Sequence, residues 1–239
     1  MKAITYSKYG SPDVLRLEEV EKPVPDDNEV LVKIHAASAN PLDWHAMRAS
    51  PFLVRLGGGL LKPKHTRLGA DVAGTVEAVG ANVTEFEPGD EVFGEVSDIG
   101  LGSFAEYIAV PETSLALKPA ALSFEGAASI PVVGFTALQG MRDTGQIQAG
   151  QSVLINGASG GIGTFAVQLA KSYDTEVTGV CSTRNLEMVR SIGADHVIDY
   201  TQEDFTRTGK QYDLIFDTIG NRSASDLKRA LLPDGICSI

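Results

Sequence analysis

Cysteine is scarce in this chain of 239 residues, which contains only Cys181 and Cys237. The two lie far apart in the sequence and form no paired motif, so the sequence excludes a disulfide framework and a cysteine-rich metal centre. So few cysteines are typical of a reducing compartment, and a cytoplasmic protein is therefore predicted.

Positive charge is also in short supply. Lys and Arg number 20 against 31 Asp and Glu, which gives a net charge of −11 at pH 7. This balance repels phosphodiester backbones and anionic lipid surfaces, so neither a nucleic acid nor a membrane is expected as partner. No apolar run approaches the roughly 20 residues of a membrane span, and the N-terminal segment lacks a signal-peptide core. The expected partner is a small molecule, and an anionic one must meet local positive groups.

The two halves of the chain differ in periodicity. Residues 1–121 read as short strands broken by turns, which predicts a β-rich domain. From residue 122 onward a helix-like stretch leads into strands alternating with helices, which is typical of an α/β domain with a parallel sheet. The predicted strands are Val30–Ala36, Val72–Val79, Glu91–Glu95 and Ser103–Val110 in residues 1–121, and Ser152–Asn156, Glu176–Cys181, His196–Asp199, Asp213–Asp217 and Gly235–Ile239 in residues 122–239.

A glycine-rich turn joins the first of the later strands to an amphipathic helix. Its glycines let a pyrophosphate approach main-chain N–H groups at a helix N-terminus, where partial positive charge collects. Gly160 and Gly163 are the positions at which this requirement is strongest. A plain strand-turn-helix is the alternative, whereas no lysine follows the turn to make a nucleotide-triphosphate loop. The predicted cofactor contacts in the turn are Ala158, Ser159, Gly160, Gly161, Ile162 and Gly163.

The end of the second parallel strand decides which dinucleotide is preferred. An acidic residue there would bind the ribose hydroxyls of NAD, but this chain has Ser182, Thr183 and Arg184. Two hydroxyls and a guanidinium can pair with a 2′-phosphate, so NADP(H) is the predicted cofactor. The alternative is that Arg184 is only a solvated residue that starts the next helix.

Six motifs in register carry a family resemblance along the whole chain. They are Met1-Lys2-Ala3-Ile4 with Gly10, Asn40-Pro41-Leu42-Asp43, Gly69 to Val76, Pro88 to Val92, Gly134 to Ala137 and Ala158 to Gly163. The sequence resembles a zinc-independent medium-chain dehydrogenase/reductase of the quinone oxidoreductase group. The resemblance implies a GroES-like domain beside a Rossmann domain, with NADPH between them. It also implies that Tyr200 joins the 2′-phosphate site and that Thr136 and Thr218 contact the cofactor.

The chain departs from the zinc-dependent branch of that family. Asn40, Ala70 and Val133 stand where that branch has its zinc ligands, and these side chains supply neither thiolate nor imidazole. No metal is therefore expected. Hydride transfer without a Lewis acid suits a quinone or an activated C=C bond, as in an enone or enal, better than a simple alcohol.

The proton donor is less evident than the cofactor site. His45 aligns with a position where relatives often carry a tyrosine near the active site, and an imidazole can donate a proton near neutral pH. The alternative is a structural or merely substrate-facing histidine. Asp43 is either an orienting carboxylate or a satisfied turn residue. Asn40 completes the candidate catalytic set.

Two further expectations concern the end of the chain and competing classes. Residues 231–239 read as the fifth strand of a six-stranded Rossmann sheet, so a C-terminally truncated or degenerate NADP(H)-binding protein with little or no turnover is the alternative function. Members of the family often form dimers, which leaves a homodimer as one option for the assembly. A short-chain dehydrogenase is disfavoured because its Tyr-x-x-x-Lys motif is absent.

Overall fold

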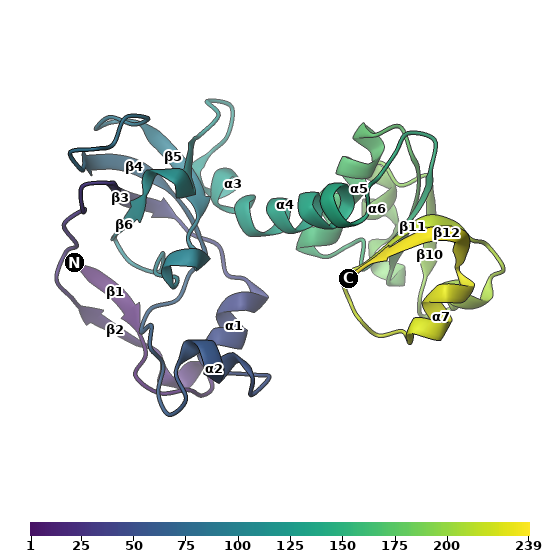
Figure 1. The fold of residues 1–239 in the computed structure, drawn as a ribbon, viewed down its shortest axis with the longest axis horizontal. Helices are drawn as coiled ribbons and strands as arrows, with labels where there is room; N and C mark the ends of the chain where they lie inside the picture. Colours follow the sequence, from purple (N-terminus) through teal and green to yellow (C-terminus); the bar gives the residue numbers. More distant parts are fainter. The chain divides into compact units, whose positions relative to one another are not determined.

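Two compact units make up the chain in the computed structural model, which describes residues 1–239 (Figure 1). The first unit is Met1–Val132 and the second is Val133–Ile239. The sequence puts the boundary after residue 121, but helix α3 (Phe124–Ala128) falls in the first unit because its buried alanines pack against Ala73 of that sheet. No helix has the length and apolar character needed to cross a bilayer.

The first unit contains a five-stranded antiparallel sheet with the order β6-β3-β4-β5-β7. Alternate residues of its strands face one cluster, for example Val30 and Val32 in one strand and Val72 and Val76 in the next, as the two-residue period of a strand requires. The strands are β3 (Glu29–Ala36), β4 (Asp71–Val79), β5 (Glu91–Glu95), β6 (Tyr107–Pro111) and β7 (Leu115–Leu117).

Three features of the first unit differ from the sequence-based expectation, and the first is that β7 was not predicted. A separate antiparallel pair, β1 (Lys2–Thr5) and β2 (Arg16–Glu19), was not predicted. The strand predicted from Ser103 begins only at Tyr107, because residues 103–106 instead bond to other segments: the Phe104 N–H donates to Leu68 and its carbonyl accepts from Ile4. The helices here, besides α3, are α1 (Pro41–Arg48) and α2 (Val54–Gly58).

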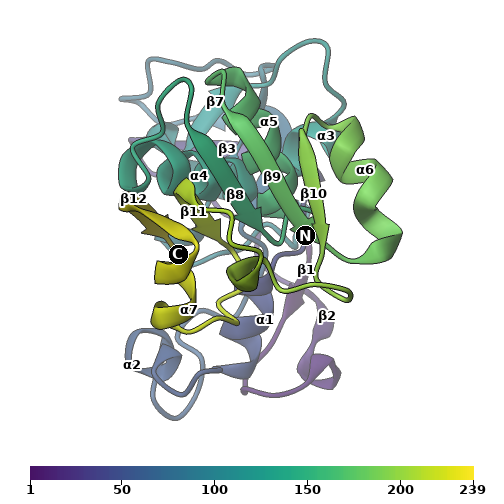
Figure 2. The same cartoon turned by 90° about the vertical axis from the view of Figure 1, so that its right-hand side faces the viewer.

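The second unit is built on a parallel sheet with the strand order β10-β9-β8-β11-β12 (Figure 2). In chain order this is 3-2-1-4-5, the arrangement of a Rossmann sheet, so the predicted fold class is confirmed. The strands are β8 (Ser152–Asn156), β9 (Glu176–Cys181), β10 (His196–Asp199), β11 (Tyr212–Asp217) and β12 (Leu231–Ser238).

Both faces of this sheet are covered, which is usual for parallel sheets. Val153 and Ile155 of β8 pack in a cluster with the buried side of α5, whereas Leu154 between them packs in a second cluster with Leu227 of α7. The helices of this unit are α4 (Pro131–Leu138, which starts in the first unit), α5 (Gly161–Ser172), α6 (Leu186–Ser191) and α7 (Ala224–Arg229).

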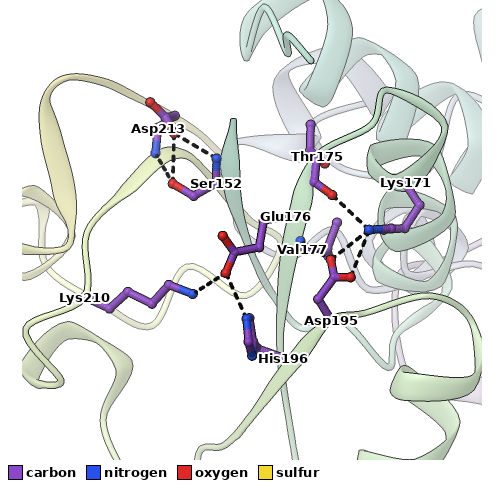
Figure 3. Close-up of polar contacts among 9 residues, drawn as sticks. All are labelled: Ser152, Lys171, Thr175, Glu176, Val177, Asp195, His196, Lys210 and Asp213. Carbon is purple, nitrogen blue, oxygen red and sulfur yellow. Dashed lines mark hydrogen bonds and ion pairs between the residues drawn. The ribbon is translucent and has the colours of Figure 1, made fainter. Parts of the chain in front are cut away.

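Polar contacts connect the starting ends of the parallel strands (Figure 3). Asp213 accepts from both the N–H and the hydroxyl of Ser152 at 2.8 Å. Glu176 contacts His196 at 2.8 Å and Lys210 at 3.0 Å. In a third contact, Lys171 donates a hydrogen bond to the Asp195 carboxylate, and this carboxylate also accepts one from the Val177 N–H. These bonds fasten the amino-terminal edge of the sheet, opposite the edge at which ligands of such folds bind.

Candidate cofactor-binding site

The turn after β8 is fastened to β9 through its backbone. The N–H groups of Gly157 and Ala158 donate to the carbonyl of Val180 at 3.2 and 3.0 Å. The N–H of Gly160 donates to the Gly157 carbonyl at 2.9 Å, which closes the turn directly before α5. The turn therefore delivers the chain from a buried strand to a helix N-terminus, as the sequence predicts.

Two glycines of this turn are required by close contacts within the protein. A Cβ on Gly163 would lie 2.1 Å from the Gly157 carbonyl oxygen, so the first turn of α5 can approach the preceding loop only without a side chain. Gly157 has φ +90°, and its Cβ would lie 2.4 Å from the hydroxyl oxygen of Thr218. The sequence singles out Gly163 but misses Gly157, whose neighbour comes from a distant strand end.

The other two glycines of the turn open toward solvent. Gly160 and Gly161 are exposed, and a Cβ on Gly160 would come no closer to the protein than 3.3 Å. The N–H groups of Gly161, Ile162 and Gly163 make no hydrogen bond within the chain, as is normal for the first turn of a helix. Three unpaired donors and the positive end of the helix dipole therefore lie together at the start of α5, beside the exposed Gly160 and Gly161. This is a cradle with the chemistry of an anion site.

A hydrogen-bonded bridge links the turn to the segment after β9. The side-chain amide of Asn185 donates to the hydroxyl oxygen of Ser159 at 3.0 Å and to that of Ser182 at 3.2 Å. Both serines keep a hydroxyl proton to donate outward. Asn185 was not predicted as a site residue, and a polar residue four positions past the strand end is the only signal that the sequence carries for it.

Arg184 and Tyr200 follow the carboxyl ends of β9 and β10, at the same edge of the sheet as the glycine turn. Arg184 is exposed and makes no ion pair or hydrogen bond within the chain. Tyr200 is 57% exposed, and its backbone N–H donates to the Cys181 carbonyl at 3.1 Å. A cation and a phenol without side-chain partners thus border the segment that contains Ser182.

The surroundings of Thr183 differ from the sequence-based expectation of a corner without carboxylates. Its hydroxyl donates to Asp199, the last residue of β10, which pairs with Cys181 in the parallel register. This bond holds the pKa of Asp199 below its usual value, so the carboxylate is charged at neutral pH. Thr183 therefore has no hydroxyl proton left for a phosphate, and a negative charge lies beside the predicted 2′-phosphate site.

Polar groups also gather where β8 and β11 end. The Thr218 hydroxyl donates to the Asn156 carbonyl at 2.8 Å. Asp217, only 2% exposed, accepts from the Asn156 amide at 2.8 Å and from the Ile219 N–H at 3.0 Å. These bonds fix the loop after β11 against the glycine turn, so Thr218 has an anchoring contact in addition to any contact with a ligand.

Helix α4 lies against the same turn. The ideal Cβ of Gly161 would lie 3.1 Å from Cγ1 of Val133, so the start of α4 within the second unit touches the start of α5. Thr136 is exposed and follows Val133 by three positions, which puts the two on one side of the helix. The candidate residues of the second unit therefore come together around a single edge of the sheet.

In the first unit, Asn40 and Asp43 belong to the start of α1. Asp43 is 5% exposed, and its two oxygens accept from the backbone N–H groups of Asn40 at 2.8 Å and Gly69 at 2.7 Å. Burial raises the pKa of Asp43, although these bonds oppose the shift. The Asn40 side chain donates to Asp71 at 2.9 Å. The geometry supports the structural alternative for Asp43, a helix-capping carboxylate.

The replacement of Asp43 by asparagine is expected to destabilise the protein. An amide has one acceptor oxygen, so one of the two backbone N–H groups would face an NH₂ group and lose its partner, at a cost of about 1–3 kcal/mol. Thermal unfolding should shift down by several degrees, on the order of 2–4 °C per kcal/mol for a chain of this size. Asp27→Asn, at an exposed position, is the control. A folded Asp43→Asn protein with unchanged melting and lost activity would instead identify a catalytic carboxylate.

His45 has a defined tautomer. Its Nδ1 contacts the carbonyl oxygen of Ser50, and since a carbonyl only accepts, Nδ1 carries the hydrogen. Nε2 is therefore the nitrogen that can gain or release a proton. The ring also meets Trp44 edge-on with 4.6 Å between centroids. The side chain is half-buried, so His45 fits either a proton-transferring or a substrate-facing residue.

A metal site would require side chains that are grouped as metal ligands. No group of three or more His, Cys, Asp or Glu side chains is arranged to hold a metal ion. Burial raises the pKa of both thiols, Cys181 and Cys237, which keeps them protonated.

Comparisons with known proteins match both units. Residues 26–120 match the alcohol dehydrogenase GroES-like domain, and residues 161–238 match the family described as zinc-binding dehydrogenase. The NADPH-dependent alkenal/one oxidoreductase of Arabidopsis thaliana chloroplasts is 42% identical over 92% of this chain and 58% of its own length. Several curated relatives are matched over only 57–60% of their length.

Solved structures agree with this match. The quinone oxidoreductase of Coxiella burnetii has a TM-score of 0.88 and 33% identity, covering 99% of this chain and 74% of that protein. The Escherichia coli quinone oxidoreductase, solved with NADPH, has a TM-score of 0.86 and 27% identity over 99% of this chain and 72% of its own. The chain therefore belongs to the quinone oxidoreductase group of the medium-chain dehydrogenases/reductases.

Proposed function

We propose that the protein is an NADPH-dependent reductase that transfers a hydride to a quinone or to an activated C=C or C=O bond of an enone or enal, without zinc. One observation carries the proposal most directly. The N–H groups of Gly161, Ile162 and Gly163 are unpaired at the start of α5, beside the exposed Gly160, and an unpaired Arg184 lies beyond the end of the adjacent strand.

The residues at the carboxyl ends of the parallel strands have separate roles in the proposed function. The three amides bind the diphosphate, while Arg184, Ser182 and Tyr200 bind the 2′-phosphate by charge-assisted hydrogen bonds. Asn185 orients Ser159 and Ser182 so that their hydroxyl protons face outward. When bound, NADPH supplies the hydride, and the protein supplies orientation and a proton.

The substrate class rests on the relatives and on the residues at the zinc positions of the zinc-dependent branch. One relative is named an alkenal/one oxidoreductase and another a 2-methylene-furan-3-one reductase, and both names describe activated alkenes. Asparagine, alanine and valine at positions 40, 70 and 133 do not supply the thiolates and imidazole that zinc prefers.

Two measurements made side by side test the proposal. NADPH binding is followed by its fluorescence, and turnover by NADPH oxidation with menadione, crotonaldehyde and methyl vinyl ketone, each with and without EDTA. We expect saturable binding, turnover with at least one acceptor and no effect of EDTA. Binding without turnover would favour an NADP(H)-binding protein of little activity, and loss of activity in EDTA would refute the zinc-free mechanism.

Replacement of His45 by alanine tests the proton donor. The substitution removes the only imidazole of α1 and leaves the second unit unchanged, so kcat should fall about 10²- to 10⁴-fold, the usual contribution of a general acid. The dissociation constant for NADPH should stay the same. A change in KM with an unaltered kcat would show that His45 only faces the substrate, and an unaltered rate would identify a structural residue.

A further inference from the structure

A cavity of about 340 Å³ lies wholly within the first unit and involves none of the candidate cofactor contacts. It is lined from both α1 and α2, from the segment that follows β1, and from residues 97–101. This volume lies in the range of small-molecule sites in proteins, roughly 300–1,000 Å³. The cavity is therefore large enough for a ligand of one or two fused rings.

The lining of this cavity is mainly apolar and aromatic. Leu42 and Ala46 come from successive turns of α1, Val54 comes from α2, and Leu101 faces them from the loop after β5. Ionisable side chains lining it, other than tyrosine, are one histidine, His65, and one acid, Asp98, both exposed. With histidine counted as neutral, Asp98 is the one charged lining residue, so the cavity offers no positive partner to an anion, and its apolar part suits a neutral ligand.

Two tyrosines bring hydroxyl groups to the cavity, and they differ in what those groups bind. The Tyr9 hydroxyl lies 2.8 Å from the Gly58 carbonyl and 2.7 Å from that of Gly59, so its single proton is used within the protein. The Tyr6 side chain is 5% exposed, yet its hydroxyl makes no hydrogen bond within the chain. The Tyr6 hydroxyl oxygen is not among the buried atoms that lack a partner, so it is accessible and its proton is free to be donated to a ligand.

The protonation state of Tyr6 makes it a donor. Burial, together with the nearby Tyr9 and Asp43, raises the pKa of Tyr6 to about 12, so the phenol keeps its proton at neutral pH. A phenol is a strong donor to a carbonyl oxygen. Ser97 and His65 also bring unpaired polar side chains to the lining, but Ser97 is half-buried and His65 is exposed, so Tyr6 is the unpaired donor that lies in the buried part of the cavity. A buried donor among apolar side chains suits a ligand with one acceptor atom on an apolar body.

We propose that this cavity binds a neutral, apolar, ring-containing ketone whose carbonyl oxygen accepts a hydrogen bond from Tyr6. The site is separate from the glycine turn of the second unit, and its occupation requires neither NADPH nor hydride transfer. The proposal can therefore be tested independently of the proposed reductase function.

The test uses indanone and its hydrocarbon counterpart indane, which differ in the carbonyl oxygen alone. Binding to the full chain without cofactor is measured by calorimetry, and the site is located by amide shifts of Gly58 and Leu101 in NMR spectra. We expect indanone to bind more tightly than indane. Tyr6→Phe should weaken indanone binding about three- to tenfold, as expected for the loss of one neutral hydrogen bond, and leave indane binding unchanged.

Two further variants make the result decisive. Tyr107→Phe, on β6 and outside the cavity lining, is the matched control and should bind both probes as the unaltered protein does. Ala46→Leu adds three carbon atoms within the cavity and should weaken both probes. Equal binding of indanone by the Tyr6→Phe protein, no shift at Gly58 or Leu101, or full binding by the Ala46→Leu protein would each overturn the proposal. Melting curves establish that every variant is folded.

Discussion

Replacement of Gly160 by valine is expected to weaken NADPH binding strongly at a modest cost in stability, since valine is less favourable than glycine at a helix N-cap. Gly160 has φ −78°, which valine can adopt, and its Cβ would come no closer than 3.3 Å to the protein. The added side chain would instead occupy the surface on which the unpaired amides converge. Loss of one or two charge-assisted hydrogen bonds of about 1.5–3 kcal/mol each predicts binding that is about ten- to a thousandfold weaker. Fluorescence titration with NADPH measures the change.

The control for this experiment is Gly126→Ala in α3, where a Cβ meets ordinary contacts at 3.5 Å or more. It should bind NADPH like the unaltered protein. Gly163→Val is a poor substitute for Gly160→Val because its Cβ would clash with the Gly157 carbonyl at 2.1 Å, so unfolding and lost binding could not be separated. A Gly160→Val protein that melts normally and binds NADPH at full strength would refute the anion cradle.

Replacement of Arg184 by alanine is expected to change cofactor preference. The guanidinium has no partner in the chain, so its removal should cost little stability. Its loss should weaken NADPH binding about tenfold or more, because a charge-assisted bond to the 2′-phosphate is lost, and leave NADH binding nearly unchanged. Both dissociation constants are measured at two salt concentrations, since screening should shrink the difference. Equal losses for the two cofactors would show that Arg184 does not bind the 2′-phosphate.

Asp199→Asn should change this preference in the opposite direction. The carboxylate, held ionised by Thr183, repels a 2′-phosphate in the same corner. Its neutral counterpart keeps an oxygen that can accept the Thr183 hydroxyl, so NADPH binding should improve roughly threefold while NADH binding stays constant, a modest gain because the group is exposed to solvent. Unchanged NADPH affinity would place the phosphate beyond the reach of Asp199.

The sequence predicted those secondary-structure elements that are determined by residues close together in the chain. The apolar run before Gly157, the glycines and the helical spacing of the residues after them were sufficient for β8, its turn and α5. The ranges of β8, β9, β10 and β11 also followed, to within a residue, from short apolar runs between turns, whereas β12 begins at Leu231, four residues before the predicted Gly235. The sheet order then brings Ser182 and Tyr200 to one edge, since parallel strands end together.

The parts that sequence analysis missed depend on contacts between distant segments. Asp199 reaches Thr183 only because β10 pairs with β9, and nothing near Thr183 in the sequence indicates a carboxylate. Asn185 acts through a hydroxyl 26 positions away. The sequence leaves two interpretations of Asp43 open because one of its partners, the Gly69 N–H, also lies 26 positions along the chain. In each case the deciding partner is set by tertiary structure.

The polar contacts of Figure 3 lie at one edge of the parallel sheet, and the candidate cofactor contacts lie at the opposite edge. Ser152, Glu176 and His196 begin their strands and Asp213 is the second residue of its own, so all four lie at the far end of their strands from the glycine turn and Arg184. Substitutions at the two edges should therefore change stability and ligand preference independently, because the two groups of residues share no partners. Substitutions meant to raise the thermal stability of the protein should begin with those charged and hydroxylated residues.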